Sequence, residues 1–114
     1  MKGNKEMSVA ETILQQLGGH RFTVMTGSNH YVSDGYTLRM HLAKNHSKAN
    51  RLEITLDEYD TYTMRFYKYT AGRLDRKTCT WTADKVEEVE TFHGIYCDQL
   101  QEIFTKVTWM YTRL

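Results

Sequence analysis

The chain has 114 residues, of which 40% are hydrophobic, 25% charged and 12% aromatic. This length and composition fit one globular domain and exclude a multidomain enzyme. Fifteen Lys and Arg against fourteen Asp and Glu give a formal net charge of +1, which excludes a strongly basic nucleic-acid protein and an acidic disordered chain as overall descriptions. We expect residues 1–7 to be a disordered end or an expression remnant and 8–114 to form a single domain.

The cysteine usage and the hydropathy pattern indicate a reducing compartment. Cys79 and Cys97 are eighteen residues apart without a second pair, which is neither a disulfide framework nor a zinc-binding spacing. The longest apolar stretches span a few residues, and the first seven residues lack the apolar segment of a secretory signal. We therefore expect a cytoplasmic protein that does not enter a membrane.

The first predicted element is a helix over 8–17. Ser8 and Glu11 have the spacing of a capping box, apolar residues then recur at helical spacing, and Gly18 with Gly19 supplies a stop. The hydrophobic pattern then changes from helical spacing to alternation. This change predicts three strands, over 22–25, 29–32 and 36–42.

Alternation returns after a polar loop over 43–50. It predicts the clearest hairpin of the chain, formed by 51–57 and 62–66 around a turn at 58–60. A further loop is expected at Ala71-Gly72-Arg73. Two more strands follow, over 78–82 and 86–92.

The last segment, from near Gly94-Ile95 to Leu114, is predicted to be a helix. Asp98 and Gln101 are spaced as a capping pair. The apolar stripe of this helix comprises Tyr96, Leu100, Ile103, Phe104, Val107, Met110 or Tyr111, and Leu114. It would cover the apolar side of the strands, which carries Leu38, Met40, Leu52, Ile54, Leu56, Met64 and Phe66. The predicted fold is therefore α+β: an N-terminal helix, an antiparallel sheet of about five strands, and a long C-terminal helix packed on one face.

Three stretches look familiar as a set. They read ILQQLGGHRFTVMTGS at 13–28, SKANRLEITLDEYDTYTMRFYKYTAGRL at 47–74, and GIYCDQLQEIFTKVTWMYTRL at 94–114. Over nearly the whole chain after Met7, the sequence resembles a family of small proteins that phages and other mobile elements of gut bacteria carry. That family has no established activity, so the resemblance implies a genomic setting and no site. The order of elements is also similar to single-stranded-DNA-binding domains of the Whirly and transcriptional-coactivator type, from which the N-terminal helix departs.

Charge is locally segregated along the chain. Arg65, Tyr67 and Tyr69 alternate with Met64 and Phe66, so the cation and both tyrosines should share the strand face that looks away from the core. Aromatic rings that stack on bases beside cations that meet phosphates are what a single-strand platform requires. The predicted interface with single-stranded nucleic acid comprises Arg39, Arg65, Tyr67, Lys68, Tyr69 and Arg73.

Three other interpretations of the surface stay open at this point. The basic face is also compatible with an ordinary solvated sheet. The chain would instead bind and inhibit a host protein, such as a defence nuclease, if its acids imitate a phosphate backbone or if an aromatic patch with Trp109 or Tyr111 is exposed. A homodimer through the last helix is the third, because a helix cannot turn three consecutive large residues, 109–111, toward one core. The acids in question are Glu53, Asp57, Glu58, Asp60, Glu87, Glu88 and Glu90.

No residue pattern indicates catalysis. None of the five histidines stands beside a Cys or a carboxylate at a recognisable metal-ligand spacing. His93 and Cys97 flank Gly94, where a thiolate near a helix start would be activated, but we interpret Cys97 as a small buried residue beside Tyr96 and Leu100. We therefore expect no enzyme activity, no metal and no cofactor.

Overall fold

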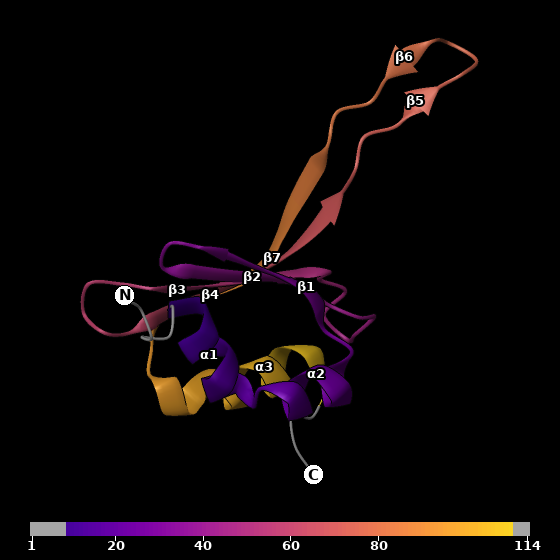
Figure 1. Cartoon of the computed structure of the whole chain (residues 1–114). Helices are drawn as coiled ribbons and strands as arrows, with labels where there is room; N and C mark the ends of the chain where they lie inside the picture. Colours follow the sequence, from indigo (N-terminus) through magenta and orange to yellow (C-terminus); the bar gives the residue numbers. More distant parts are fainter. Residues whose placement is uncertain (1–8, 111–114) are drawn as a thin grey trace, which may run out of the picture.

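The computed structural model describes residues 9–110 and shows an antiparallel sheet with α-helices on one side (Figure 1). The elements in chain order are α1 (Val9–Leu17), α2 (His20–Thr26), β1 (Asn29–Asp34), β2 (Thr37–His41), β3 (Arg51–Leu56), β4 (Tyr62–Thr70), β5 (Leu74–Asp75), β6 (Thr80–Trp81), β7 (Lys85–Ile95), the 3-10 turn η1 (Cys97–Gln99) and α3 (Leu100–Thr108). The main sheet has five strands in the order β1-β2-β3-β4-β7. The predicted α+β fold is thus confirmed.

Helix α1 matches the first predicted element. It buries Ala10, Ile13 and Leu17, which recur at helical spacing, and it ends at the Gly18-Gly19 pair. The amide of Gly19 donates to the carbonyl of Leu14 at 2.9 Å, which satisfies one of the last carbonyls of the helix. Ser8, the predicted cap, lies outside the described residues.

The predicted strand over 22–25 is wrong, because this segment is helix α2. Phe22 and Thr26, one helical turn apart, are buried, whereas Val24 between them is exposed. In a strand these three residues would share one face, so this burial pattern fits a helix. The Phe22 ring packs edge-on against the Phe104 ring, with 4.9 Å between the ring centroids. Gly27 ends the helix with a left-handed φ of 70°, a conformation that favours glycine. Over so few residues, an alternating pattern also fits one face of a short helix.

The three central strands place the predicted apolar residues on one face, and their pairing aligns these residues in rows. Met40 stands opposite Leu52, and Leu52 opposite Phe66, so one buried row crosses the sheet. A second row joins Leu38, Ile54 and Met64. All of these side chains are buried beneath the helices, and burying each large one stabilises the fold by roughly 1.5–3 kcal/mol.

The C-terminal helix is shorter than the sequence predicted. Helix α3 ends at Thr108, because Trp109 takes a left-handed φ of 63° and the Thr108 carbonyl accepts the His46 amide at 3.1 Å. Its start also differs, since the amide of Tyr96 donates to the side chain of Gln99 at 2.9 Å in place of the predicted Asp98–Gln101 pair. Trp109 is therefore not helical, so 109–111 are not three consecutive helical residues as the dimer prediction assumed. Residues 111–114 lie outside the described residues.

A two-stranded arm, residues 71–84, projects from the far end of β4 and β7 (Figure 1). The predicted strand over 78–82 is found here as β6, paired with β5 and separate from the main sheet. The arm makes the molecule elongated, with a radius of gyration of 16.0 Å and extents of 53 × 37 × 27 Å. A compact chain of this length has a radius of gyration of about 13 Å. No helix within residues 9–110 has the length and apolar character needed to cross a bilayer.

Candidate functional site

The outer face of the sheet, which looks away from the helices, brings several predicted site residues together. Arg39 of β2 stands opposite Glu53 of β3, and Glu53 stands opposite Arg65 of β4. Tyr67 and Tyr69 follow Arg65 on the same side of β4, because alternate residues of a strand share a face. The sequence thus placed Arg39, Arg65 and both tyrosines correctly on one surface.

Two arginines of this face, Arg39 and Arg65, are paired with carboxylates in a row across five strands. We call this set the charge row; its members are Asp34, Arg39, Glu53, Arg65 and Glu88. Arg39 pairs with Asp34 and Glu53, at 3.1 Å each, while Arg65 pairs with Glu53 at 3.2 Å. The Nε of Arg65 also donates to Glu88 at 2.8 Å. A phosphate group would have to compete with these carboxylates for either arginine.

The charge row also shifts the titration of its members. The hydrogen bonds from Arg65 hold the pKa of Glu88 below its ordinary value. The same bonds to Glu88, together with those to Glu53, raise the pKa of Arg65. Both residues therefore carry full charge near neutral pH, and the row holds two cations against three anions.

The two tyrosines of the outer face are held by neighbouring charges. The guanidinium of Arg65 lies over the Tyr67 ring, 4.2 Å from its centroid, and that of Arg51 lies 5.2 Å from the centroid of Tyr69. The Tyr67 hydroxyl donates to Glu53 at 3.0 Å. Burial raises the pKa of Tyr67, and this hydrogen bond raises it further. One face of each ring is therefore already occupied.

The base of the arm is fixed by Asp84. Its carboxylate accepts the Tyr69 hydroxyl and the amide of Gly72, at 2.7 Å each, and these bonds lower the pKa of Asp84. A Cβ at position 72 would stand 1.9 Å from the carbonyl oxygen of Thr82, so only glycine lets the two strands of the arm approach this closely. The side chain of Asn50 exchanges two hydrogen bonds of 2.8 Å with the backbone of Tyr69.

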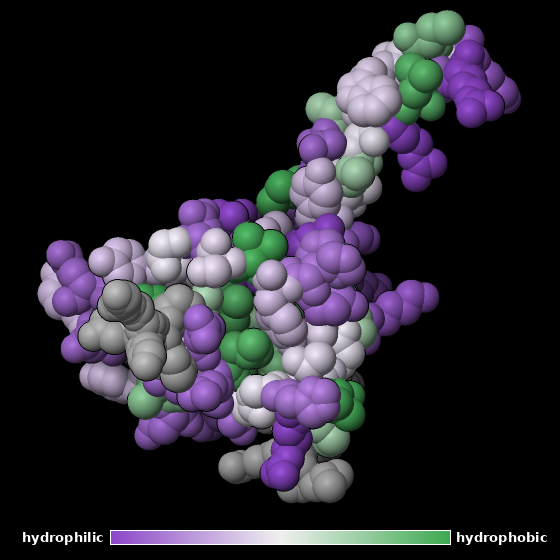
Figure 2. Space-filling model, viewed as in Figure 1, coloured by the Kyte–Doolittle hydropathy of each residue, from purple (hydrophilic) through white to green (hydrophobic). Residues whose placement is uncertain are grey.

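The arm carries cations of a different kind from those of the charge row. Arg73, Arg76 and Lys77 are exposed, and none of them makes an ion pair within the described part of the chain. Leu74 and Trp81 stand opposite each other on the ribbon, with 53% and 65% of their surface exposed. In Figure 2 the end of the arm shows strongly hydrophilic surface beside hydrophobic surface. The sequence analysis found Arg73 here but missed Arg76, Lys77 and Trp81, although the basic run 73–77 was visible.

Lys68 does not lie on the predicted face. It has the strand parity of Met64 and Phe66, it stands opposite Glu87 of β7, and it is exposed. The six predicted residues therefore divide into three groups. Arg39, Arg65 and Tyr67 belong to the charge row or contact it, Lys68 and Tyr69 lie at the end of β4, and Arg73 lies on the arm.

The acids that would imitate a phosphate backbone are largely engaged in the fold. Glu53 and Glu88 belong to the charge row, and Glu87 pairs with Lys85 at 3.5 Å. Asp57 accepts the amides of Tyr59 and Thr61, and the hydroxyl of Thr61 lowers its pKa. Glu58 and Asp60 remain exposed at the β3–β4 turn, and Glu90 on β7.

The histidines and cysteines form no reactive constellation in 9–110. Cys97 is exposed, so our interpretation of a buried residue is wrong; it belongs to η1, which faces solvent. His93 instead meets the Thr63 hydroxyl at 3.3 Å. No three His, Cys, Asp or Glu side chains gather as metal ligands among the described residues.

A hollow of about 430 Å³ lies beside the end of α3, where Trp109 stacks on His46. It is lined by His46, Ser47, Val89, Glu90, Phe92, Lys106, Val107 and Trp109. Its opposite charges, Lys106 and Glu90, give it no clear preference for an anion or a cation.

Comparison of the chain with family models, curated proteins and solved structures gives no match. The resemblance to mobile-element proteins therefore stays a prediction.

Proposed function

We propose that this protein is a non-catalytic module that binds single-stranded nucleic acid along the arm and the adjoining end of β4. One observation supports the proposal above the others. Arg73, Arg76 and Lys77, which have no ion-pair partner within 9–110, stand together on a projection that adds no residue to the hydrophobic core.

The cations of the charge row and those of the arm differ in whether they already have a carboxylate partner. Arg39 and Arg65 already have carboxylate partners, and moving either arginine to a phosphate would leave Glu53 with a missing partner. The arm cations lose only water when they bind a phosphate, and each contact releases counterions from the nucleic acid. In this proposal the charge row stiffens the sheet and holds Tyr67, while the arm makes the ionic contacts.

The arm fits a ligand-binding role because it does little for the stability of the domain. Its residues are almost all exposed, and an isolated two-stranded ribbon is marginally stable in water. Asp84 and Gly72 nevertheless fix its base on the sheet. The arm therefore holds its cations away from the main sheet, where a ligand can reach them.

The test is binding of a fluorescein-labelled oligothymidine of about 15 nucleotides, since single-strand sites cover roughly 4–16 nucleotides. Fluorescence anisotropy is measured for the wild type and for the double variant Arg76→Gln/Lys77→Gln over a range of salt concentrations. Loss of two phosphate contacts should make the slope of log affinity against log salt shallower by about 1.4. The ratio of wild-type to variant affinity should therefore rise about 25-fold when the salt concentration is lowered from 1 M to 0.1 M.

The matched control is Arg21→Gln/Lys106→Gln, which removes the same charge from exposed positions on α2 and α3. We expect this control to keep most of the wild-type affinity. Absence of binding by the wild type at low salt would contradict the proposal, and so would an equal loss of affinity in the two double variants.

A further inference from the structure

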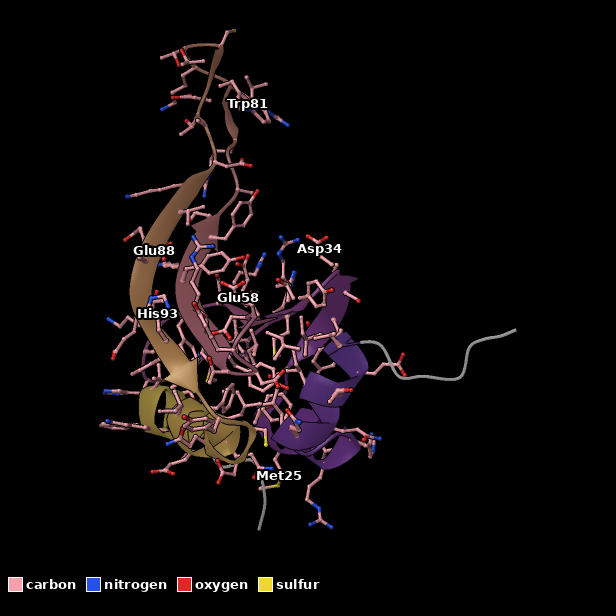
Figure 3. The ribbon with its side chains drawn as sticks, turned by 90° about the vertical axis from the view of Figure 1, so that its left-hand side faces the viewer. Met25, Asp34, Glu58, Trp81, Glu88 and His93 are labelled. Carbon is pink, nitrogen blue, oxygen red and sulfur yellow. The ribbon has the colours of Figure 1, made fainter. Side chains whose placement is uncertain are left out.

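The indole of Trp81 is an aromatic surface that the fold leaves uncovered. It is 65% exposed and stands opposite Leu74, so the two side chains share one face of the ribbon. Figure 3 shows Trp81 far out on the arm, well away from Glu88 and His93 on β7. Within 9–110 it makes no ring stacking and no cation–π contact.

Other candidate rings for base stacking are already in use. Tyr67 and Tyr69 carry the guanidiniums of Arg65 and Arg51, and Trp109 stacks on His46. A base would have to displace these partners before it could stack there.

Three exposed tyrosines, Tyr36, Tyr59 and Tyr96, have open rings but the wrong neighbours. Tyr59 lies between Glu58 and Asp60 at the β3–β4 turn. Tyr96 has Asp98 two residues away in the sequence, and Tyr36 lies at the β1–β2 turn beside Asp34 and Arg39, which already pair with each other. Carboxylates beside a ring repel the phosphates that flank a stacked base.

The arm around Trp81 carries more cations than carboxylates, because Asp75 beside Leu74 is outnumbered by Arg73, Arg76 and Lys77. Arg76 follows Leu74 by two residues, and Arg76 and Lys77 both belong to the turn that joins β5 and β6. Arg73 precedes Leu74 directly. Cations therefore stand on both sides of the Leu74–Trp81 pair along the ribbon, so phosphates on either side of a stacked base have partners within reach.

We propose that Trp81 is the base-stacking site of the arm: one base of a single strand stacks on the indole beside Leu74, while Arg76 and Lys77 contact the neighbouring phosphates. This inference rests on the proposed function and adds to it the residue that recognises the base. Stacking on an aromatic ring needs no particular base, so binding should tolerate different sequences. Paired bases offer no free ring face to the indole, so a duplex should bind without stacking.

The experiment uses the intrinsic fluorescence of Trp81. The chain contains two tryptophans, so Trp109→Phe leaves Trp81 as the single emitter. The labelled oligothymidine reports binding by anisotropy, and an unlabelled copy reports stacking by quenching of Trp81. We expect quenching to follow binding with the same midpoint, and a duplex of oligothymidine with oligoadenylate to give no quenching.

Variants complete the test. Trp81→Ala should lower the affinity about 5- to 150-fold, which corresponds to the 1–3 kcal/mol of one stacked base, and Trp81→Phe should restore most of it. Tyr59→Ala removes a ring of comparable exposure and should leave the affinity unchanged. Because Trp81 has no core contact, its substitution should not shift the thermal unfolding midpoint.

The outcomes separate this inference from the proposed function. Binding without quenching, together with unchanged affinity of Trp81→Ala, overturns the stacking site and leaves the nucleic-acid function standing. Equal quenching by duplex and single strand overturns the single-strand assignment. Failure of the wild type to bind the oligothymidine at low salt overturns both proposals.

Discussion

Replacing Glu53 with Gln removes the charge at the centre of the charge row. Its carboxylate accepts from Arg39 at 3.1 Å, from Arg65 at 3.2 Å and from the Tyr67 hydroxyl at 3.0 Å, and its side chain is 19% exposed. An exposed ion pair contributes roughly 0.2–1 kcal/mol, and the pair with Arg39, which is 45% exposed, belongs at the lower end. The amide of Gln still accepts from Tyr67, so we expect a loss of about 1–1.5 kcal/mol in the free energy of unfolding.

Thermal unfolding followed by circular dichroism measures this loss. A domain of this size loses about 4 °C of melting temperature per kcal/mol, so Glu53→Gln should melt roughly 4–6 °C below the wild type at low salt. At 1 M salt, where the Debye length is about 3 Å, the difference should shrink. The control is Glu87→Gln, whose ion pair with Lys85 at 3.5 Å joins two mostly exposed side chains. Equal melting temperatures for the two variants would refute the assignment of the row as a stabilising network.

Two further predictions concern the arm and the pH dependence. Gly72→Ala forces the arm strands apart at Thr82, so trypsin should cleave within 73–77 faster while the melting temperature stays within about 2 °C; unchanged cleavage would contradict the close approach. Glu88 has a folded-state pKa below its ordinary value of 4.5 because of Arg65. Its contribution to stability is present above pH 4.5 and is lost as the pH falls through the folded pKa. Urea midpoints should therefore fall less steeply with acidification in Glu88→Gln than in the wild type, and parallel curves would exclude this linkage.

The clearest success of the sequence analysis is the alternation between positions 36 and 66. Side chains of a strand alternate between faces by local geometry, so a run such as Leu52 to Phe66 indicates which residues enter the core wherever the strand ends up. The faces of Arg39, Arg65 and Tyr67 follow from the same rule. The same rule places Lys68 on the face of Met64 and Phe66, so its inclusion in the predicted interface was wrong.

The segment around Phe22 shows where local reasoning fails. Its alternation is short, and the burial of Phe22 against Phe104 comes from a residue far along the chain. The end of α3 is a similar case, since the His46 amide binds the Thr108 carbonyl and the His46 ring stacks on Trp109. The contacts of Phe104 with Phe22, and of His46 with the end of α3, join residues far apart in the chain, so the sequence around Phe22 or Thr108 does not reveal them.

By itself, the sequence determined the hairpin of β3 and β4 and the division of the residues of the central strands into a buried and an outer face. Only the tertiary structure decided which of the cations are neutralised. Glu88 reaches Arg65 because β7 returns beside β4 after the arm, and Trp81 stays open because β6 leaves the main sheet. The physical reason is that ion pairing depends on which side chains neighbouring strands place within a few ångströms of each other. For Glu88 and Arg65 that placement follows from the pairing of β7 with β4 across the arm, which no local spacing of residues encodes.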